Sequence, residues 1–139
     1  MIKRIVFVLI SAIAILAGCK KSNPSPSASI VGKWYFTSIR VQMFVQQTEP
    51  VLDTTYTNLT GLYFQFNSDG TGVDYDPMRL AVSEDFTWSV SGNQETETPA
   101  STEIPMVYTI GINGSTMTRH TNYTLLNGYT YIVDDVMHK

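Results

Sequence analysis

Cysteine, histidine and basic residues are all scarce in this chain of 139 residues, which has one cysteine, two histidines and nine Lys and Arg residues. Cys19 therefore has no partner for an intramolecular disulfide, and with His120 and His138 it offers too few ligands for a typical structural zinc site. The twelve acidic residues give a formal net charge of −3. Because phosphate binding needs clustered Lys and Arg, we expect neither a metal site nor a nucleic-acid partner.

Apolar runs long enough to cross a bilayer are also missing. The longest uncharged apolar run covers residues 5–17 and follows Lys3 and Arg4. It is shorter than the ~20 residues that a spanning helix needs. A short basic segment followed by such a run is typical of a secretory signal peptide.

The run ends in the sequence Leu-Ala-Gly-Cys at residues 16–19, which resembles the lipobox of bacterial lipoproteins. An ordinary buried or disulfide-bonded cysteine is the alternative, but Cys19 has no second cysteine and lies at the edge of the apolar run. The resemblance implies cleavage before Cys19 and acylation, for example with palmitate, on its sulfur and on the new amino group. Each buried methylene contributes ~0.8 kcal/mol, so a multiply acylated cysteine predicts stable membrane anchoring.

The chain divides into three expected parts. Residues 1–18 form the cleaved signal, and their removal takes away Lys3 and Arg4 and lowers the net charge from −3 to −5. Cys19 then begins a tether that extends to residue 29 and is rich in serine and proline. Residues 30–139 form one domain, long enough for a modest hydrophobic core.

Most of residues 30–139 alternates apolar and polar side chains, which is the pattern of half-buried strands. Turn signals at Asp69-Gly70, Asn113-Gly114 and Asn127-Gly128 separate several runs. We count seven or eight strands, and predict an all-β antiparallel up-and-down barrel, with a β-sandwich as the alternative. Residues 76–85 suggest a short helix, and residues 46–58 and 92–103 are expected to be long loops.

A glycine, a spacer and a tryptophan begin the first expected strand, at Gly32 and Trp34. With the following antiparallel meander, this resembles the lipocalins. More closely, the chain resembles the short lipocalin-like lipoproteins of Bacteroidetes, with matching motifs at residues 66–71 (Phe-Asn-Ser-Asp-Gly-Thr) and 88–90 (Trp-Ser-Val). The resemblance implies that Trp34, together with Gly32, plugs the closed end of a barrel, and that residues 46–58 arch over the open end.

Lipocalins also stack an arginine of the final strand over this tryptophan. The final expected strand here has no arginine. Stacking of Arg119 or Arg40 on Trp34 is physically possible instead.

Aromatic residues dominate the expected inward face of the strands. They either bind an apolar ligand or fill the barrel themselves, since eight strands enclose just enough room for side chains or one small ligand. We predict ligand contacts at the end opposite Trp34. The predicted residues are Phe66, Phe86 and Tyr108, with Met43 and Phe44 at the rim.

Residues for catalysis or metal binding do not form a recognisable pattern. Asp69, Asp74 and Asp76 could bind calcium, but they lack the spacing of an EF-hand, and a hairpin turn explains them as well. Ser101 and Ser115 have no associated base, and the Gly-x-Ser-x-Gly motif is missing. We therefore expect no enzyme and no cofactor.

The sequence predicts a lipid-anchored protein of the cell envelope, on the periplasmic face of the outer membrane, that binds a small apolar ligand or a peptide. The alternative is a non-catalytic structural or interaction lipoprotein with a filled barrel, docking another envelope component. The sequence names no protein partner.

Overall fold

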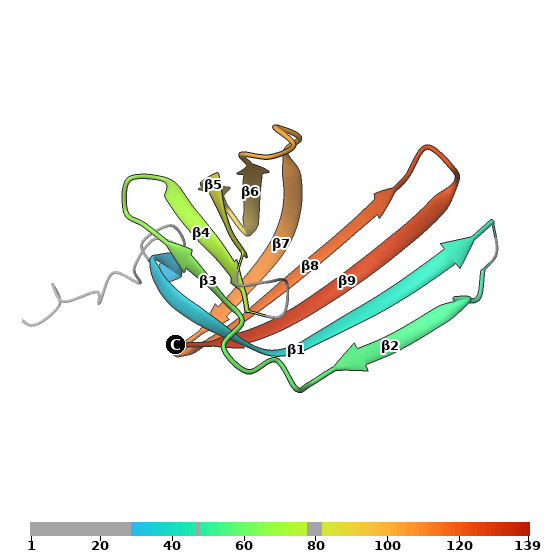
Figure 1. The fold of residues 1–139 in the computed structure, drawn as a ribbon, viewed down its shortest axis with the longest axis horizontal. Helices are drawn as coiled ribbons and strands as arrows, with labels where there is room; N and C mark the ends of the chain where they lie inside the picture. Colours follow the sequence, from blue (N-terminus) through green and yellow to red (C-terminus); the bar gives the residue numbers. More distant parts are fainter. Residues whose placement is uncertain (1–28, 47, 78–81) are drawn as a thin grey trace, which may run out of the picture.

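The structure is a computed structural model that describes residues 29–46, 48–77 and 82–139. The predicted signal peptide, Cys19 and nearly all of the tether lie outside these residues. The described chain contains nine strands (Figure 1): β1 Gly32–Val45, β2 Leu52–Tyr56, β3 Tyr63–Phe66, β4 Thr71–Asp76, β5 Val82–Ser91, β6 Gln94–Pro99, β7 Met106–Asn113, β8 Thr116–Thr124 and β9 Tyr129–His138.

The strands form one antiparallel sheet in the order β2-β1-β3-β4-β5-β6-β7-β8-β9, and pairing of β1 with β9 closes it. Eight strands make the closed barrel, and β2 is an additional strand. The prediction of an all-β antiparallel barrel is therefore confirmed, and the sandwich alternative is excluded. Consecutive strands pair from β3 to β9, as expected for an up-and-down meander with short connections.

The first strand belongs to two parts of the sheet. Residues 32–35 of β1 pair with β3, whereas residues 39–43 pair with β2 along the same edge. The register between β1 and β9 shifts between Phe36 and Ser38, which marks a β-bulge that bends the strand. Beyond the bulge, β1, β2, β8 and β9 continue together as an open four-stranded extension beside the rounded barrel body (Figure 1).

The predicted turns lie where glycine permits them. Gly70, Gly114 and Gly128 all have positive φ angles and sit between β3 and β4, β7 and β8, and β8 and β9. L-residues with a Cβ rarely adopt this conformation, so glycine at these points sets the hairpins.

Three expectations of local structure are wrong. The segment expected as the first long loop contains β2, and the segment expected as the second contains β6. The expected helix at residues 76–85 is not found in the described part of that segment, because β4 ends at Asp76 and β5 begins at Val82. In each case the partner strand supplies pairing that local sequence cannot reveal.

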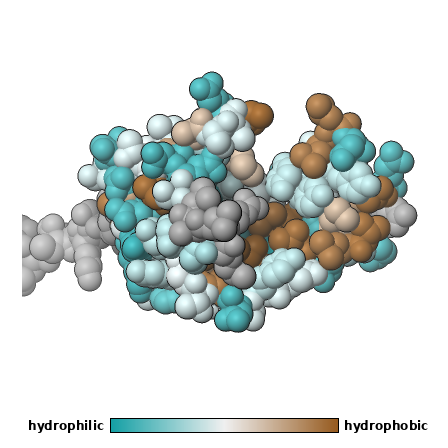
Figure 2. All heavy atoms as spheres, viewed as in Figure 1, coloured by the Kyte–Doolittle hydropathy of each residue, from teal (hydrophilic) through white to brown (hydrophobic). Residues whose placement is uncertain are grey.

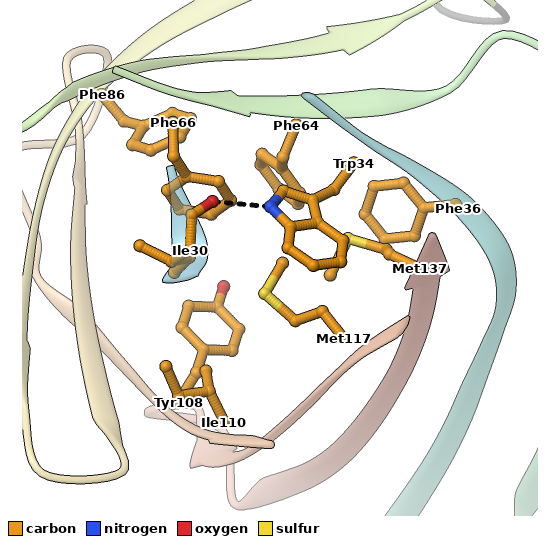
Figure 3. Packing of buried hydrophobic residues seen from close by; sticks show 10 residues of the cluster. All are labelled: Ile30, Trp34, Phe36, Phe64, Phe66, Phe86, Tyr108, Ile110, Met117 and Met137. Carbon is orange, nitrogen blue, oxygen red and sulfur yellow. Dashed lines mark hydrogen bonds between the residues drawn. The ribbon is translucent and has the colours of Figure 1, made fainter. Parts of the chain in front are cut away.

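Inward side chains fill the part of the barrel around Trp34 (Figure 3). The cluster comprises Ile30, Trp34, Phe36, Phe64, Phe66, Phe86, Tyr108, Ile110, Met117 and Met137. Close packing leaves no room at Gly72, where an added Cβ would lie 2.2 Å from the ring of Phe86 and 2.7 Å from the carbonyl oxygen of Gln65. This end of the barrel is a packed core rather than a cavity.

Trp34 is fully buried, and its Nε1 donates a 2.6 Å hydrogen bond to the carbonyl oxygen of Ile30. The cation over its ring is Lys139, whose Nζ lies 4.6 Å from the ring centroid. The same Nζ donates to the carbonyl oxygens of Ser29 and Val31. The proposed stacking of Arg119 or Arg40 on Trp34 is therefore wrong, since the last residue of the chain supplies the cation.

Candidate functional site

The inner face of β1, β9 and β8 is built from successive cross-strand rows, which follow directly from the register. From the core outward the rows are Phe36, Met137 and Met117; then Ile39, Asp135 and Arg119; then Val41, Val133 and Thr121; then Met43, Tyr131 and Tyr123. One row of charge thus separates the packed core from an apolar surface that continues along the extension.

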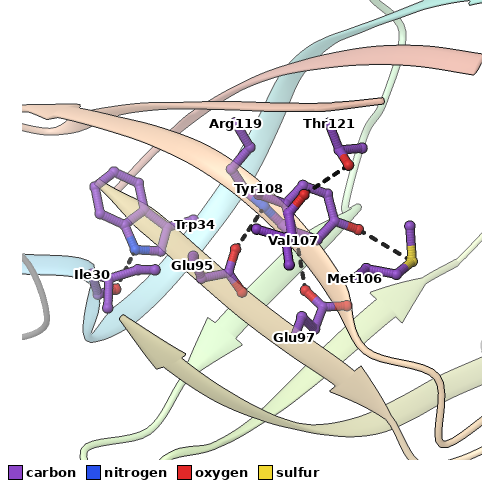
Figure 4. A network of polar contacts seen from close by, with 9 residues as sticks. All are labelled: Ile30, Trp34, Glu95, Glu97, Met106, Val107, Tyr108, Arg119 and Thr121. Carbon is purple, nitrogen blue, oxygen red and sulfur yellow. Dashed lines mark hydrogen bonds and ion pairs between the residues drawn. The ribbon is translucent and has the colours of Figure 1, made fainter. Parts of the chain in front are cut away.

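Arg119 is the centre of a buried polar cluster (Figure 4). Its side chain is 1% exposed, and its Nη2 donates a 2.8 Å hydrogen bond to the Oε2 of Glu97. Its Nε lies 3.2 Å from the Oε2 of Glu95, as an ion pair without hydrogen-bond geometry. The guanidinium also lies over the rings of Tyr108 and Phe64, with its Cζ 3.7 Å and 4.5 Å from their centroids.

Burial and pairing act in opposite directions on these groups. Burial raises the pKa of Glu95 to about 7, although the charge of Arg119 opposes this. Burial disfavours the charged form of Arg119, but the charges of Glu95 and Glu97 outweigh it and raise the arginine's pKa. Arg119 therefore stays charged, and the cluster depends on its carboxylate partners.

A pocket of about 270 Å³ spans the charged row at the mouth of the barrel, since its lining runs from Phe36 of the core row through Asp135 to Val133. Its apolar lining consists of Phe36, Ile39, Leu62, Phe64 and Val133, and its acidic lining consists of Asp74, Asp76, Glu84 and Asp135. No Lys, Arg or His is among these lining residues. The pocket is therefore apolar and acidic together, which suits a ligand with an apolar part and a positive charge.

Two mouth carboxylates hold their protons unusually tightly. Burial raises the pKa of Asp135 to about 6 against the opposing charge of Arg119. Burial, helped by the charge of Glu97, also raises the pKa of Asp74 to about 6. Such displaced values in a pocket are typical of functional groups.

We expect the stability of the protein to fall as the pH rises from about 4 to about 7. The folded state raises the pKa values of Asp135, Asp74 and Glu95, so in this window it binds protons that the unfolded chain has already released. Their contribution is fully present below pH ~4 and is lost as the pH passes through the folded-state values. Raising the pKa of Asp135 from 3.8 to about 6 corresponds to a change of up to ~3 kcal/mol in the free energy of unfolding across this pH range.

Urea unfolding across this pH range measures the effect. Asp135→Asn should flatten the slope, because it removes a buried titrating group. Asp134→Asn is the matched control, since Asp134 is the preceding residue and is exposed on the outer face, where it contacts His120. A stability that rises steadily from pH 4 to 7 would contradict the assigned directions.

The extension presents an open apolar face next to the pocket. Figure 2 shows hydrophobic residues gathered along this part of the molecule, beside the barrel body. Ile39 and Val133 belong to the pocket, and Val41, Met43 and Tyr131 continue the same face outward. The pocket is thus the inner end of a longer apolar surface.

A second groove, of about 650 Å³, lies between the start of β7 and the end of β8. The ladder between these strands stops at the pair Thr109–His120, whereas β8 continues along β9 to Thr124. Its lining includes Ile104, Val107 and Leu126, all of which are exposed. This groove lies outside the acidic mouth and has no acidic or basic side chain in its lining.

The predicted ligand contacts separate into two groups in the structure. Phe66, Phe86 and Tyr108 belong to the buried core with Trp34, and Gly32 pairs directly with Phe66. The expectation that these three aromatics lie at the end opposite Trp34 is therefore wrong; the strand register places them at the same end. Their rings are packed against other core side chains and are at most 8% exposed.

Met43 and Phe44 lie on the extension, where residues next to each other point to opposite faces. Met43 is on the inner face in register with Tyr131, whereas Phe44 shares the outer face with Arg40 and Gln42. The structure therefore brings Met43 toward the apolar surface and turns Phe44 away. Whether either residue contacts a ligand stays a prediction.

The burial of Glu95 and Glu97 inside the barrel was not predicted from the sequence. Glu95 and Glu97 lie in a polar segment that suggests a solvated loop, yet they are only 0% and 5% exposed. Their spacing by two residues would place both on one face of a strand. Without knowing that Arg119 lies opposite them, however, burial of two glutamates is the less expected outcome.

Within the described ranges, no group of three or more His, Cys, Asp or Glu residues is arranged to hold a metal ion. No helix formed by the described residues has the length and apolarity to cross a membrane. His138 contacts Thr37 on the barrel surface.

Comparison with known proteins supports the architecture. A family model described as a lipocalin-like domain matches residues 30–119, which begin just before β1 and end within β8. The match includes Trp34, both acidic residues of β6 and Arg119. No curated protein matches the chain.

Proposed function

Because the chain belongs to the lipocalin-like domain family, we propose that it is a non-enzymatic carrier that binds a small ligand with an apolar part at the barrel mouth. The observation that carries this proposal is the continuity between the 270 Å³ mouth pocket and the apolar inner face of the extension. The core around Trp34 is filled, whereas the mouth offers a ligand apolar surface without displacing packed side chains.

Binding of a neutral apolar fluorophore, N-phenyl-1-naphthylamine, tests this function. Val133→Asn is expected to weaken binding roughly tenfold, because it places an amide in the apolar lining of the pocket. Ile132→Asn is the matched control: it is the neighbouring aliphatic residue on β9 and points to the outer face, in register with Gln42.

Native mass spectrometry of the purified full-length protein, searching for co-purified lipids, complements this titration. Equal binding to both variants would remove the pocket from the proposal. A protein that binds no fluorophore and carries no lipid would overturn the carrier function.

We also propose that the protein is a lipoprotein of the cell envelope, anchored through Cys19 on the periplasmic face of the outer membrane. The support is the order of basic residues, apolar run and Leu-Ala-Gly-Cys at the start of the chain. The resemblance to Bacteroidetes lipoproteins of this type supports the same cellular localisation.

Replacing Cys19 by serine is expected to prevent acylation and to leave the signal uncleaved by the lipoprotein signal peptidase, so that any release from the membrane fraction requires cleavage elsewhere. Fractionation followed by mass measurement of the chain checks both outcomes. Ser22→Ala, three residues further on, is a control that should retain cleavage and anchoring. A processed Cys19→Ser protein that remains with the membrane would contradict the lipid anchor.

A second candidate function is docking of another envelope component by a barrel that carries no ligand. The observation that favours it is further exposed apolar surface: the groove of about 650 Å³, whose described lining carries no charge, and the side chains of Val51, Leu52, Leu125 and Leu126 near the hairpin ends. Cross-linking from this groove in the absence of any bound lipid would favour docking over carriage.

A further inference from the structure

The pocket at the mouth of the barrel is lined by carboxylates. Asp74, Asp76, Glu84 and Asp135 line it, and none of the described residues that line it is basic. Glu84 accepts hydrogen bonds from Ser101, on a neighbouring loop. Among the described residues, the buried cation Arg119 lowers the pKa values of both Asp74 and Asp135, against the larger effect of burial.

Arg119 makes its closest polar and ring contacts with residues of β6 and β7. Its Nη2 bonds to Glu97, its Nε faces Glu95, and its plane lies over Tyr108. Its Nη1 has no hydrogen-bond partner in the described structure, so it forms no bond to Asp135. The charge of Arg119 therefore favours the ionised forms of Asp74 and Asp135, although Arg119 forms no hydrogen bond with either carboxylate.

Asp135 is the clearest sign of a missing cation. It is only 7% exposed and lines the pocket, yet no described residue forms a hydrogen bond or ion pair with it. A buried carboxylate without a partner is costly, and proteins normally pair such groups or neutralise them. Its position beside Ile39 and Val133 puts this carboxylate at the junction of the charged row and the apolar face.

We propose that the ligand of the mouth pocket is a cationic amphiphile, with an ammonium group bound at Asp135 in the pocket that Asp74 also lines, and an apolar chain lying along Val133, Val41 and Met43. This inference rests on the proposed carrier function and specifies its ligand class. A pocket of 270 Å³ is small for a whole ligand but suits a headgroup and its first carbons, with the remainder on the open inner face. The raised pKa values of the two aspartates agree with a site that lacks its counter-charge.

Three ligands of equal chain length separate charge from apolar contact: decylammonium, 1-decanol and decanoate. Each is titrated into the full-length protein by calorimetry at pH 7.5, with decylammonium and decanoate below their micelle concentrations and 1-decanol below its solubility limit. Decylammonium is expected to bind at least about tenfold more tightly than 1-decanol, because hydrogen bonds to charged groups are the stronger kind. Decanoate is expected to bind most weakly, since the mouth repels it.

Asp135→Asn should weaken decylammonium about tenfold and leave 1-decanol within about twofold. Asp74→Asn should act in the same direction and serves as the second variant if the first does not fold. Asp134→Asn, on the outer face of the same strand, should leave all three affinities unchanged.

The outcomes distinguish the two levels of the proposal. Equal affinity for the three ligands, or a preference for decanoate, would overturn the cationic ligand and leave the carrier function intact. Failure of all three to bind would overturn both. Loss of decylammonium binding in Asp134→Asn as well as in Asp135→Asn would also contradict a site at the mouth.

Discussion

Replacing Arg119 by methionine is expected to lower the free energy of unfolding by about 3–5 kcal/mol. The substitution keeps an apolar side chain of similar length but leaves Glu95 and Glu97 buried without their positive partner. Removing one member of a buried ion pair costs more than the pair itself contributes, because each remaining carboxylate must either stay charged in a poorly solvating interior or take up a proton. Urea unfolding at pH 7.5 measures the loss.

Two controls show whether burial causes the effect. Arg40→Met removes an arginine that pairs with Asp53 on the solvent-exposed outer face, and we expect a much smaller change because solvent screens that pair. Converting Glu95 and Glu97 to glutamine together with Arg119→Met should recover part of the lost stability. Equal effects of Arg119→Met and Arg40→Met would show that the buried cluster does not matter for folding.

Replacing Trp34 by alanine is expected to cost about 3–5 kcal/mol, the usual range for deleting a large buried aromatic. The indole is fully buried, packs in the core cluster and carries the 2.6 Å hydrogen bond to Ile30. Its removal leaves a cavity and also deprives Lys139 of the ring beneath it. Thermal and urea unfolding report the loss.

The neighbouring Tyr35→Ala is the control, since its side chain points outward and is 39% exposed. Trp34→Phe should fall between the two, because the ring remains while the carbonyl oxygen of Ile30 loses its donor. If Tyr35→Ala destabilises the protein as much as Trp34→Ala, packing around the tryptophan is not what holds this end of the barrel together.

The strand pattern was predictable because alternation has a period of two that local sequence reveals directly. The turns at Gly70, Gly114 and Gly128 were predictable for the same reason: a positive φ angle requires particular residue types. β2 and β6 were not predictable, since both segments are polar and short, and their strand conformation depends on pairing with β1 and with β5 and β7.

Phe66 and Tyr108 show that whether a side chain points into a barrel and where it lies along the barrel axis are separate questions. Alternation correctly placed both side chains inside, but their position along the axis depends on the stagger between strands. The register Gly32–Phe66 brings Phe66 to the end where β1 begins. Sequence reasoning therefore assigned to the open end three aromatics that belong to the packed core.

The sequence by itself determined that the domain is an all-β antiparallel structure with aromatic residues on the inward face of its strands, because side-chain alternation and glycine turns are local properties. Only the tertiary structure decided where the barrel is filled and where it is open. It also placed Glu95 and Glu97 of β6 and Asp135 of β9 near Arg119 of β8. Their meeting results from strand register and barrel closure, which are set by pairing between segments far apart in the chain.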